Sequence, residues 1–441
     1  MSASPRELAF EIVAELRNQG FEAWLVGGCV RDLLLGISPK DYDVCTNATP
    51  AQVLSLWPDS QRVGAHFGVV LVHRAGIHVE VATYRSEGEY HDGRRPSGVR
   101  FETDVRLDVQ RRDFTINALL MDPFTSQVAD HVGGQADLAS RTIRAIGNPE
   151  RRFREDHLRM LRAVRFAARL GFDIHPDTAA AIGRLHPLVQ DVSAERVRDE
   201  IVRILTEGAA RRGFELLMYT GLLHTVLPEV EEMRGVEQPP QYHPEGDVWT
   251  HTLIMLEGVP SGAPAALAMG VLLHDVGKPG TFRMADRIRF DGHVELGVKI
   301  ARQILARLRF SNEDARQVEA LVDNHMKFKD APKMKDSTLK RFLRLEDFGQ
   351  HLELHRLDCA SSHGSLDNYD YVQSRREELG EEHIRPPRLI TGHDLLALGI
   401  PPGPEVGKLL DQIEDAQLEG RIATKEEALA LVPRPRVGRE T

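Results

Sequence analysis

Two glycines and two aspartates near the start of the chain have the types and spacing that phosphate chemistry requires. Gly27 and Gly28 follow an apolar run, so the backbone there can approach a ligand closely and offer N–H groups to an anion. Asp41 and Asp43 are two residues apart in a strand-like segment, so both carboxylates face the same way. Adjacent carboxylates repel unless a cation lies between them, and Mg²⁺ prefers one or two carboxylates together with substrate phosphates. The pattern predicts a Mg²⁺ site beside a phosphate-binding turn.

A third acid, Glu80, lies in the strand-like segment HVEVATYR. Its side chain points away from those of Val79 and Val81, which can enter a core. If this strand neighbours that of Asp43, Glu80 completes a cluster able to bind two metals, as in phosphoryl transfer. The alternative is a cross-strand ion-pair partner, and the sequence leaves both open.

The elements that must position these acids alternate between strand and helix patterns over the first 145 residues. A helix is expected to end at Gly20, and strands are expected in FEAWLVGG, DYDVCT, GVVLVH and IHVEVATY. Residues 150–230 then show helical spacing in LRMLRAVRFAARLGF, TAAAIGRLHPLV and AERVRDEIVRILTEG. A polar, proline-containing bridge separates this region from a histidine-rich helical one. The pattern predicts several domains.

Composition narrows the class of protein. The chain has 441 residues, 41% of them hydrophobic, which excludes a wholly disordered chain. It has no apolar run of about 18 residues and its N-terminus lacks a signal-peptide layout, so we expect a cytoplasmic protein without a membrane partner. Three distant cysteines exclude a disulfide framework. A net charge of −10 argues against non-specific coating of nucleic acid, but it permits a local basic cleft.

Three segments carry a family resemblance. LVGGCVRDLLLG with DYDV, then RRDFTINALLMDP, then GNPERRFREDHLRMLRAVRFAARLGF resemble, in order, the motifs of the class II (bacterial-type) tRNA nucleotidyltransferase and poly(A) polymerase family. The resemblance implies an α+β fold and template-independent nucleotide transfer to the 3′ end of RNA. The expected domains are a small mixed-sheet nucleotidyltransferase head (1–145), an elongated all-α neck and body (146–235), a helical, histidine-rich domain (236–385) and a helical tail (386–441).

The resemblance also implies roles for individual residues. Asp41 and Asp43 match the Mg²⁺-binding pair, to which Glu80 would add a third catalytic acid. The residues expected to bind nucleotide are Gly27, Gly28 and Arg31 on the triphosphate side, Arg111, Arg112, Asp113 and Asn117 on sugar and phosphates, and Glu155, Asp156, Arg159, Arg162 and Arg165 on the base side. Arg offers fixed donors to phosphate oxygens, while Asp and Asn can bond ribose hydroxyls.

Base selection is expected at the motif EDxxR. Asp156 and Arg159 are three residues apart, so on one helix they would share a face. Asp is an acceptor and Arg a donor, so the pair complements cytosine and adenine, which each offer an amino donor beside a ring-nitrogen acceptor. Uracil and guanine instead present a carbonyl acceptor beside a ring N–H. Rejection would be worth a few kcal/mol, because the wrong base leaves buried charges unpaired. The alternative is an exposed ion pair. Arg162 and Arg165, further along, would support the base pocket or contact phosphate.

The charged, glycine-containing segment between Tyr84 and Asp113 is the next candidate. In the family, a flexible loop here helps the switch from adding C to adding A. An ordinary surface connection is the alternative.

A helical His251, an adjacent His274–Asp275 pair and a distant Asp358 form a second constellation. It resembles the HD phosphohydrolase superfamily, so residues 236–385 are the expected HD domain and these four residues are its expected metal ligands. Imidazole with carboxylate suits Mg²⁺, Mn²⁺ or Ni²⁺, and such an ion would activate water for phosphate-ester hydrolysis. The alternative for each histidine is a satisfied core position.

Three more residues fall near these ligands in the sequence. His293 and His325 are expected as outer ligands or phosphate contacts, and Lys278 as a phosphate contact. In nucleotidyltransferases with such a domain, the resemblance implies a phosphatase or cyclic-phosphate activity that cleans RNA 3′ ends.

The leading hypothesis is CCA addition to the tRNA 3′ end from CTP and ATP, with no DNA partner. A partial enzyme that adds only CC or only the terminal A has nearly the same motifs. A poly(A) polymerase is less favoured, because the chain is acidic, lacks an extended basic tail, and has GAHFGVVLVH after the aspartate pair. A catalytically inactive RNA-binding module would gain nothing from clustered acids beside phosphate. A hydrolase whose first half only binds RNA is a further alternative.

Overall fold

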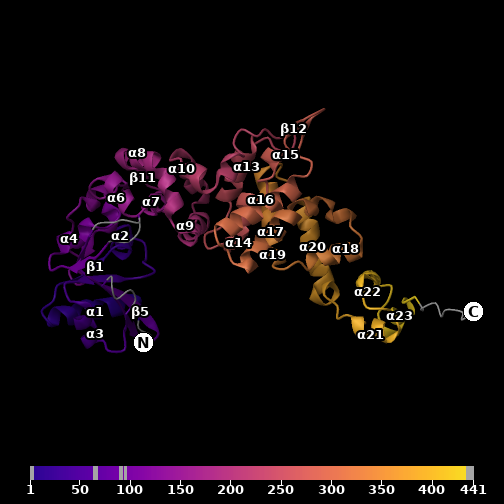
Figure 1. The fold of residues 1–441 in the computed structure, drawn as a ribbon, viewed down its shortest axis with the longest axis horizontal. Coiled ribbons are helices and arrows are strands. Elements are labelled where there is room, and N and C mark those ends of the chain that lie inside the picture. Colours follow the sequence, from indigo (N-terminus) through magenta and orange to yellow (C-terminus); the bar gives the residue numbers. More distant parts are fainter. Residues whose placement is uncertain (1–3, 63–67, 89–92, 94–96, 434–441) are drawn as a thin grey trace, which may run out of the picture. The chain divides into compact units, whose positions relative to one another are not determined.

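The computed structural model describes residues 4–62, 68–88, 93 and 97–433 (Figure 1). The chain divides into two compact units. The first comprises residues 1–231 with 260–262 and 307–309, and the second comprises 232–259, 263–306 and 310–441. The predicted α+β class is confirmed. The predicted domain boundaries after residues 145, 235 and 385 stay predictions.

A mixed sheet forms the centre of the first unit. Within the described residues its seven strands lie in the order β3-β4-β5-β2-β1-β8-β9. Only β2 and β5 pair in parallel, and the other neighbours are antiparallel. The bounds are β1 Ala23–Val26, β2 Asp43–Thr46, β3 Gln61–Arg62, β4 Val69–Arg74, β5 Ile77–Thr83, β8 Leu120–Met121 and β9 Val128–Ala129.

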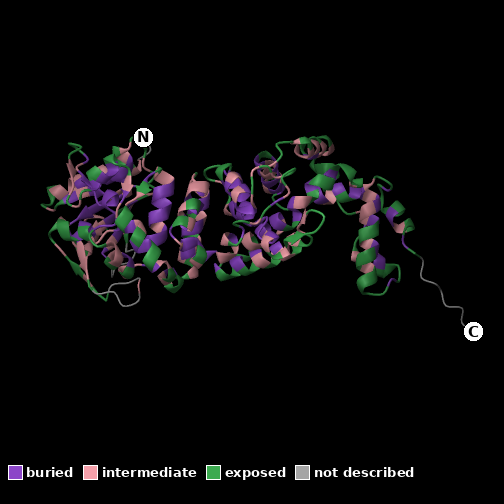
Figure 2. Ribbon diagram, turned by 90° about the horizontal axis from the view of Figure 1, so that it is seen from above, coloured by how far each residue is buried: buried purple, intermediate pink, exposed green. Residues whose placement is uncertain are grey.

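Helix α1 (Pro5–Asn18) packs on this sheet and shows why the local patterns are predictive. Ser4 and Glu7 form a capping box at its start, and apolar residues at helical spacing face the core. The helix ends at Asn18, with Gln19 as its C-cap and Gly20 next at φ +83°, so the predicted stop is confirmed to within two residues. Figure 2 shows the resulting concentration of buried residues around the sheet.

Short elements connect and cover the sheet. They are α2 Gly28–Leu34, α3 Pro50–Leu56, β6 Arg85–Glu87, β7 Val99–Phe101, α4 Val105–Gln110, the 3-10 turn η2 Thr115–Asn117, α5 Gly134–Ala139 and β10 Thr142–Ile143. Strand β10 pairs in parallel with β11 (Asp173–Ile174), which follows the first long helix of the next region.

Helices complete the first unit. They are α6 Pro149–Glu155, α7 Arg159–Leu170, α8 Pro176–Leu185, η3 His186–Asp191, α9 Ala194–Thr206, α10 Ala210–Tyr219, α11 Leu222–Val226 and α12 Pro228–Glu231. Helix α7 packs against both α9 and α10.

Up to residue 433, where the described part of the chain ends, the second unit is helical apart from the hairpin β12 (Arg283–Met284) and β13 (Ile288–Arg289). Its helices are α13 Val248–Glu257, α14 Ala265–Leu273, α15 Lys278–Thr281, α16 His293–Arg307, α17 Asn312–Asn324, η4 His325–Lys333, α18 Asp336–Leu343, α19 Phe348–Ser361, α20 Asp367–Ile384, α21 Gly392–Ala397, α22 Pro404–Leu418 and α23 Lys425–Ala430. The last three surround their own apolar cluster.

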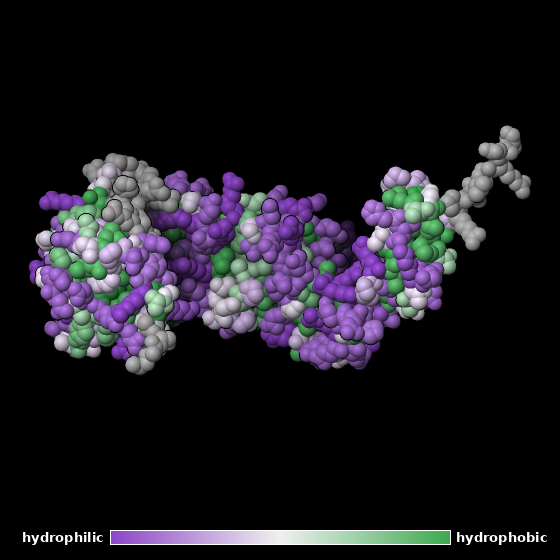
Figure 3. Space-filling model, turned by 90° about the horizontal axis from the view of Figure 1, so that it is seen from below, coloured by the Kyte–Doolittle hydropathy of each residue, from purple (hydrophilic) through white to green (hydrophobic). Residues whose placement is uncertain are grey.

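Among the described residues, none of the helices combines the length and apolarity needed to cross a membrane. On the face drawn in Figure 3, hydrophilic residues predominate between scattered hydrophobic ones.

Candidate active sites

Two of the three acids predicted to bind Mg²⁺ lie on neighbouring strands. Asp43 is the first residue of β2 and lies in register with Glu80 of the parallel strand β5. Val79 and Val81 are buried while Glu80 is exposed, so the predicted orientation and the predicted strand neighbourhood are both confirmed. Asp41 lies just before β2 and is exposed.

The electrostatics of Asp43 favour a cation. Burial, and then the negative charges of Glu80 and Asp41, raise the pKa of Asp43 to about 6, although Arg112 opposes the shift. Among the described residues, the three acids do not form a group whose ligand atoms all lie within 4.8 Å of one another. An ion would therefore have to draw these carboxylates together.

Gly27 links the strand β1 to helix α2 beside this acid. Its φ of +82° and ψ of −137° suit only glycine. A Cβ atom there would lie 3.6 Å from both Arg112 Nη1 and Asp43 Oδ2. The turn thus brings bare backbone next to an acid and an arginine, as the sequence predicted for a phosphate-binding turn.

A fully buried aspartate fixes the two arginines of the RRD motif. Asp108 Oδ1 accepts from Arg111 Nε and Nη2 at 2.9 and 2.7 Å, and Oδ2 accepts from Arg112 Nη2 at 3.0 Å. Burial alone would raise the pKa of Asp108, but these guanidinium groups hold it below its usual range. Asp108, which precedes Arg111 by three residues, was not predicted from the sequence.

Asp113 and Asn117 connect the sheet region to helix α7. Asp113 Oδ2 accepts from Arg162 Nε and Nη2 at 2.9 and 2.7 Å, and Asp113 Oδ1 accepts from Asn117 Nδ2 at 3.2 Å. Asn117 Oδ1 accepts from Arg31 Nη1 at 2.7 Å. Burial alone would raise the pKa of Asp113, but Arg162 brings it to about 2.

The expectation that Asp156 and Arg159 share one helix face is wrong. Helix α6 ends at Glu155, Asp156 is extended (φ −143°, ψ 107°), and α7 begins at Arg159. Arg159 Nη1 donates to Glu155 at 3.0 Å, whereas Asp156 accepts from Arg196 Nη2 at 2.9 Å. The alternative, an exposed ion pair between Asp156 and Arg159, is not formed either.

A cavity of about 500 Å³ nevertheless brings most of the predicted nucleotide-binding residues together. Its lining comprises Gly27, Gly28, Arg31, Asp43, Arg111, Arg112, Asp113, Asn117, Asp156, Leu158, Arg159, Arg162, Arg165, Phe166, Arg196 and Arg203. Of the predicted residues in this unit, Asp41, Glu80 and Glu155 are not in the lining.

Two arginines of this lining were missed from the sequence. Arg196 and Arg203 both lie on α9, seven residues apart, which is the two-turn spacing of one helix face. The sequence shows that spacing, but no local pattern indicates that this helix face meets the segment around Asp156. Arg165, on the adjacent helix, donates from Nε to the buried Glu200 at 2.6 Å.

Two predictions lie wholly or partly outside the described residues. The proposed switching loop includes residues 89–92 and 94–96, and the segment GAHFGVVLVH includes 64–67.

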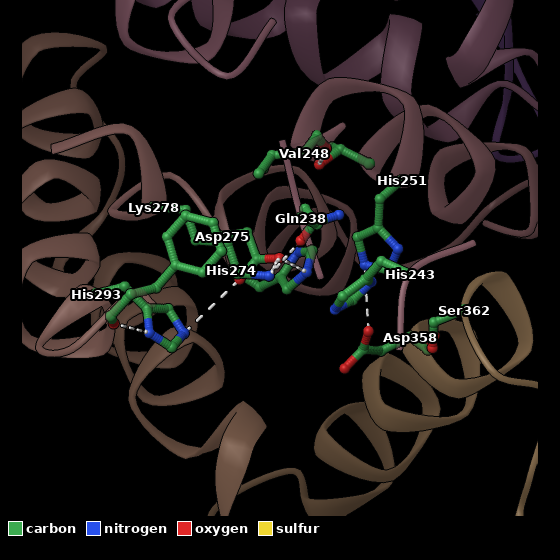
Figure 4. A network of polar contacts seen from close by, with 12 residues as sticks. Gln238, His243, Val248, His251, His274, Asp275, Lys278, His293, Asp358 and Ser362 are labelled. Carbon is green, nitrogen blue, oxygen red and sulfur yellow. Dashed lines mark hydrogen bonds and ion pairs between the residues drawn. The ribbon is translucent and has the colours of Figure 1, made fainter. Parts of the chain in front are cut away.

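In the second unit, the predicted HD residues converge. His251 of α13 and Asp358 of α19 point toward one another, with Nε2 and Oδ1 3.2 Å apart (Figure 4). His274 Nε2 lies 3.1 Å from Asp275 Oδ2. The ligand atoms of His251, His274 and Asp358 all lie within 4.8 Å of one another.

Surrounding groups orient this cluster. The Nδ1 atom of His274 bonds to a backbone carbonyl at 2.9 Å, leaving Nε2 to face the cluster. His251 Nδ1 bonds to Glu245 at 2.7 Å, a contact that sequence analysis missed. Burial alone would lower the pKa of His251, yet Asp358 and Glu245 raise it to about 9. A cation here would therefore replace a proton.

His293 and His325 lie on the other side of Asp275. Each Nε2 is 3.8 Å from Asp275 Oδ1, and the three ligand atoms form a second group within 4.8 Å. Lys278 Nζ lies 2.6 Å from Asp275 Oδ2. Burial alone would raise the pKa of Asp275, but His274 and Lys278 hold it well below its usual range.

Family models match three parts of the chain. The model described as "Poly A polymerase head domain" matches residues 23–144, and "Probable RNA and SrmB- binding site of polymerase A" matches residues 171–234. A model for tRNA nucleotidyltransferase domain 2 matches residues 293–432.

Relatives and solved structures agree with these matches. The CCA-adding enzyme of Lactobacillus johnsonii is 32% identical over 96% of this chain and 95% of its own length. The crystal structure of the Bacillus stearothermophilus CCA-adding enzyme in complex with CTP covers 96% of this chain and 95% of that one, with 28% identity and a TM-score of 0.73. Poly(A) polymerase I of Escherichia coli O6:H1 is 43% identical over about half of each chain (51% and 50%).

The similarity to known proteins therefore extends over almost the whole chain, which includes the mixed sheet and the arginine-lined cavity. The chain belongs to the family of class II CCA-adding enzymes and poly(A) polymerases, and it is a tRNA nucleotidyltransferase.

Proposed function

We propose that the first unit adds C and A to the 3′ end of tRNA, using CTP and ATP. The observation that supports this most is the cavity of about 500 Å³ that joins Gly27 and Asp43 to the base-selecting residues Asp156 and Arg159. One nucleotide could contact the acid with its phosphates and the helical motif with its base.

Asp41, Asp43 and Glu80 are the proposed ligands of Mg²⁺. The fit rests on Asp43, whose pKa is raised to about 6 by burial and neighbouring acids, so Arg112 compensates its ionised form only in part. When bound, Mg²⁺ would lower the barrier by neutralising charge on the reacting phosphate oxygens.

The chain's own arginines would bind and orient the nucleotide. Asp108 fixes Arg111 and Arg112 with their guanidinium groups at the cavity, so little ordering is needed when phosphate arrives. Asp113 and Asn117 connect the acid-bearing sheet to α7 and would align the sugar with the base.

Asp156 and Arg159 are still proposed to select the base, but from separate backbone segments. Arg196 holds the carboxylate of Asp156 at 2.9 Å, so its position does not depend on Arg159. An amino group of C or A would bond to Asp156, and a ring nitrogen would accept from Arg159.

In the second unit, His251, His274, Asp275 and Asp358 are the proposed ligands of a divalent metal, Mg²⁺, Mn²⁺ or Ni²⁺. Their fit rests on imidazole Nε2 atoms that face carboxylates at 3.1 and 3.2 Å in a buried cluster. Such an ion would supply activated water for removal of phosphate from RNA 3′ ends. Lys278, Arg289 and Lys329 line the adjoining cavity of about 600 Å³ and would bind the phosphate.

Two variants separate the proposed activities. Asp41→Ala should lower incorporation of CMP into tRNA by at least about 100-fold and leave phosphate release intact. Asp275→Ala should lower phosphate release and leave incorporation of CMP into tRNA intact. Asp59→Ala, at an exposed acid outside both sites, is the matched control. Loss of both activities in either variant, with the fold retained, would contradict two independent sites.

A further inference from the structure

Phe166 of helix α7 is the one aromatic side chain among the described residues that line the cavity of the first unit. Three guanidinium groups lie over its ring, that of Arg165 at 4.3 Å from the ring centroid, that of Arg31 at 5.2 Å and that of Arg162 at 5.3 Å. A guanidinium within about 6 Å of a ring centroid is attracted by the negative face of the ring. All three arginines line the same cavity. One uncharged side chain therefore contacts three of its positive charges.

A different carboxylate bonds to each of these arginines in the described part of the chain. The bonded pairs are Arg31 with Asp32 at 2.6 Å, Arg162 with Asp113 at 2.7 Å and Arg165 with Glu200 at 2.6 Å. Each ion pair fixes one guanidinium group to its own carboxylate and leaves its position relative to the other two guanidinium groups undetermined. The ring of Phe166 is in contact with all three, so it can set their relative positions.

The surroundings of the ring leave no free face for a nucleobase. Phe166 is 6% exposed, and the ring of Phe114 packs against it edge to face, with centroids 5.9 Å apart and an angle of 79° between the planes. The guanidinium groups lie over the remaining ring surface. An aliphatic side chain would fill the same space, but only an aromatic ring attracts cations in this way. The ring is therefore better suited to holding arginines than to stacking on a base.

We propose that Phe166 is a positioning residue that holds Arg31, Arg162 and Arg165 together as one cationic group for the phosphates of the incoming nucleotide. This inference rests on the proposed nucleotide transfer in the first unit. Three like charges repel one another, and their common attraction to the ring opposes that repulsion before the nucleotide arrives. Donors that are already in place lose less side-chain freedom on binding. Of the two roles that the sequence left open for Arg162 and Arg165, the inference favours contact with phosphate.

Fluorinated phenylalanines at position 166 of the full chain, introduced by nonsense suppression, test this role. Each fluorine withdraws electron density from the ring face, which weakens the attraction of cations while the shape of the side chain changes little. Rings with one, two and three fluorines should raise KM for CTP and for ATP stepwise, to about tenfold with three. The value of kcat and the KM for tRNA should change by less than about twofold, because the lost contacts orient the nucleotide alone.

The same series at Phe214 is the matched control. Phe214 of helix α10 is fully buried in the same unit, and within the described residues no cation lies over its ring. Fluorination there should leave every KM unchanged. Phe166→Leu, which removes the aromatic face but keeps an apolar side chain, should raise KM for both nucleotides by at least as much as three fluorines do. Circular dichroism of each variant checks that the fold is retained.

The possible failures are distinguishable. A KM for CTP and ATP that does not depend on the number of fluorines would overturn the inference. A rise for only one of the two nucleotides would also overturn it, because their phosphates are the same, and so would an equal rise in the KM for tRNA. If the parent chain binds CTP in calorimetry but transfers no CMP to tRNA, the proposed function is wrong, and the affinity for CTP across the fluorinated series then decides the role of Phe166. A parent chain that does not bind CTP would overturn both.

Discussion

At the scale of single residues, the most informative group is Asp43. Its carboxylate lies beside Glu80 in register and beside the bare backbone of Gly27. Its charge is unfavourable in the protein alone, and this same property makes the position suitable for a cation.

The pH dependence of stability follows from this shift. The pKa of Asp43 rises from 3.8 to about 6, so the folded state binds its proton more tightly than the unfolded state does. This contribution to stability is complete below about pH 4 and is lost as pH rises through about 6. In EDTA above pH 7, Asp43→Asn should therefore raise the melting temperature by roughly 2–4 °C. Calorimetry at pH 5 and 8 checks this, and an increment that does not shrink toward low pH would contradict it.

Base selection gives a second prediction at this scale. Asp156→Ala should raise incorporation of U and G relative to C by about 10- to 100-fold, because the selective acceptor is lost. Binding of Mn²⁺ at the head should change little. Steady-state incorporation of all four nucleotides measures the ratio, with Asp173→Ala, an exposed acid, as the control. Unchanged discrimination would contradict the pairing scheme.

At the scale of elements, we propose that the turn between β1 and α2 determines how closely a nucleotide can approach Asp43. Gly27→Ala should destabilise the protein by about 1–3 kcal/mol because of its positive φ, and should raise KM for CTP and ATP about tenfold. Gly183→Ala is the control, since Gly183 lies in helix α8 with no atom within 4 Å of an added Cβ. It should be neutral or stabilising by up to about 1 kcal/mol. Equal KM values for parent and Gly27→Ala would contradict the role of the turn.

Elements with local signals were predictable from sequence. Alternating valines place Glu80 on the accessible side of β5, and capping residues with Gly20 define α1. The break between α6 and α7 was not predicted, because REDHLRML contains neither glycine nor proline and continues a helical pattern across Asp156.

Such local patterns could not predict the contacts between elements that are distant in the sequence. Arg196 shows helical spacing with Arg203, yet its ion pair with Asp156 spans 40 residues and depends on how α9 packs against α7. Likewise, the sequence indicated His293 and His325 as outer ligands or phosphate contacts. Their convergence on Asp275 Oδ1 was not predictable, because it depends on how the helices of the second unit pack.

At the scale of the whole molecule, a chain with a net charge of −10 concentrates eight arginines around one cavity. Local rather than overall charge would therefore bind the nucleotide triphosphate, and the acidic remainder would disfavour non-specific RNA binding. The second compact unit contains the histidine clusters, so each proposed chemistry has its own set of residues.

The most direct test of CCA addition is extension of tRNA that lacks its 3′ CCA, resolved at single nucleotides. With CTP alone the product should be two residues longer, with CTP and ATP three residues longer, and with ATP alone unchanged. Extension should then stop. A long tail with ATP alone, or addition of only CC or only A when both nucleotides are present, would contradict the account.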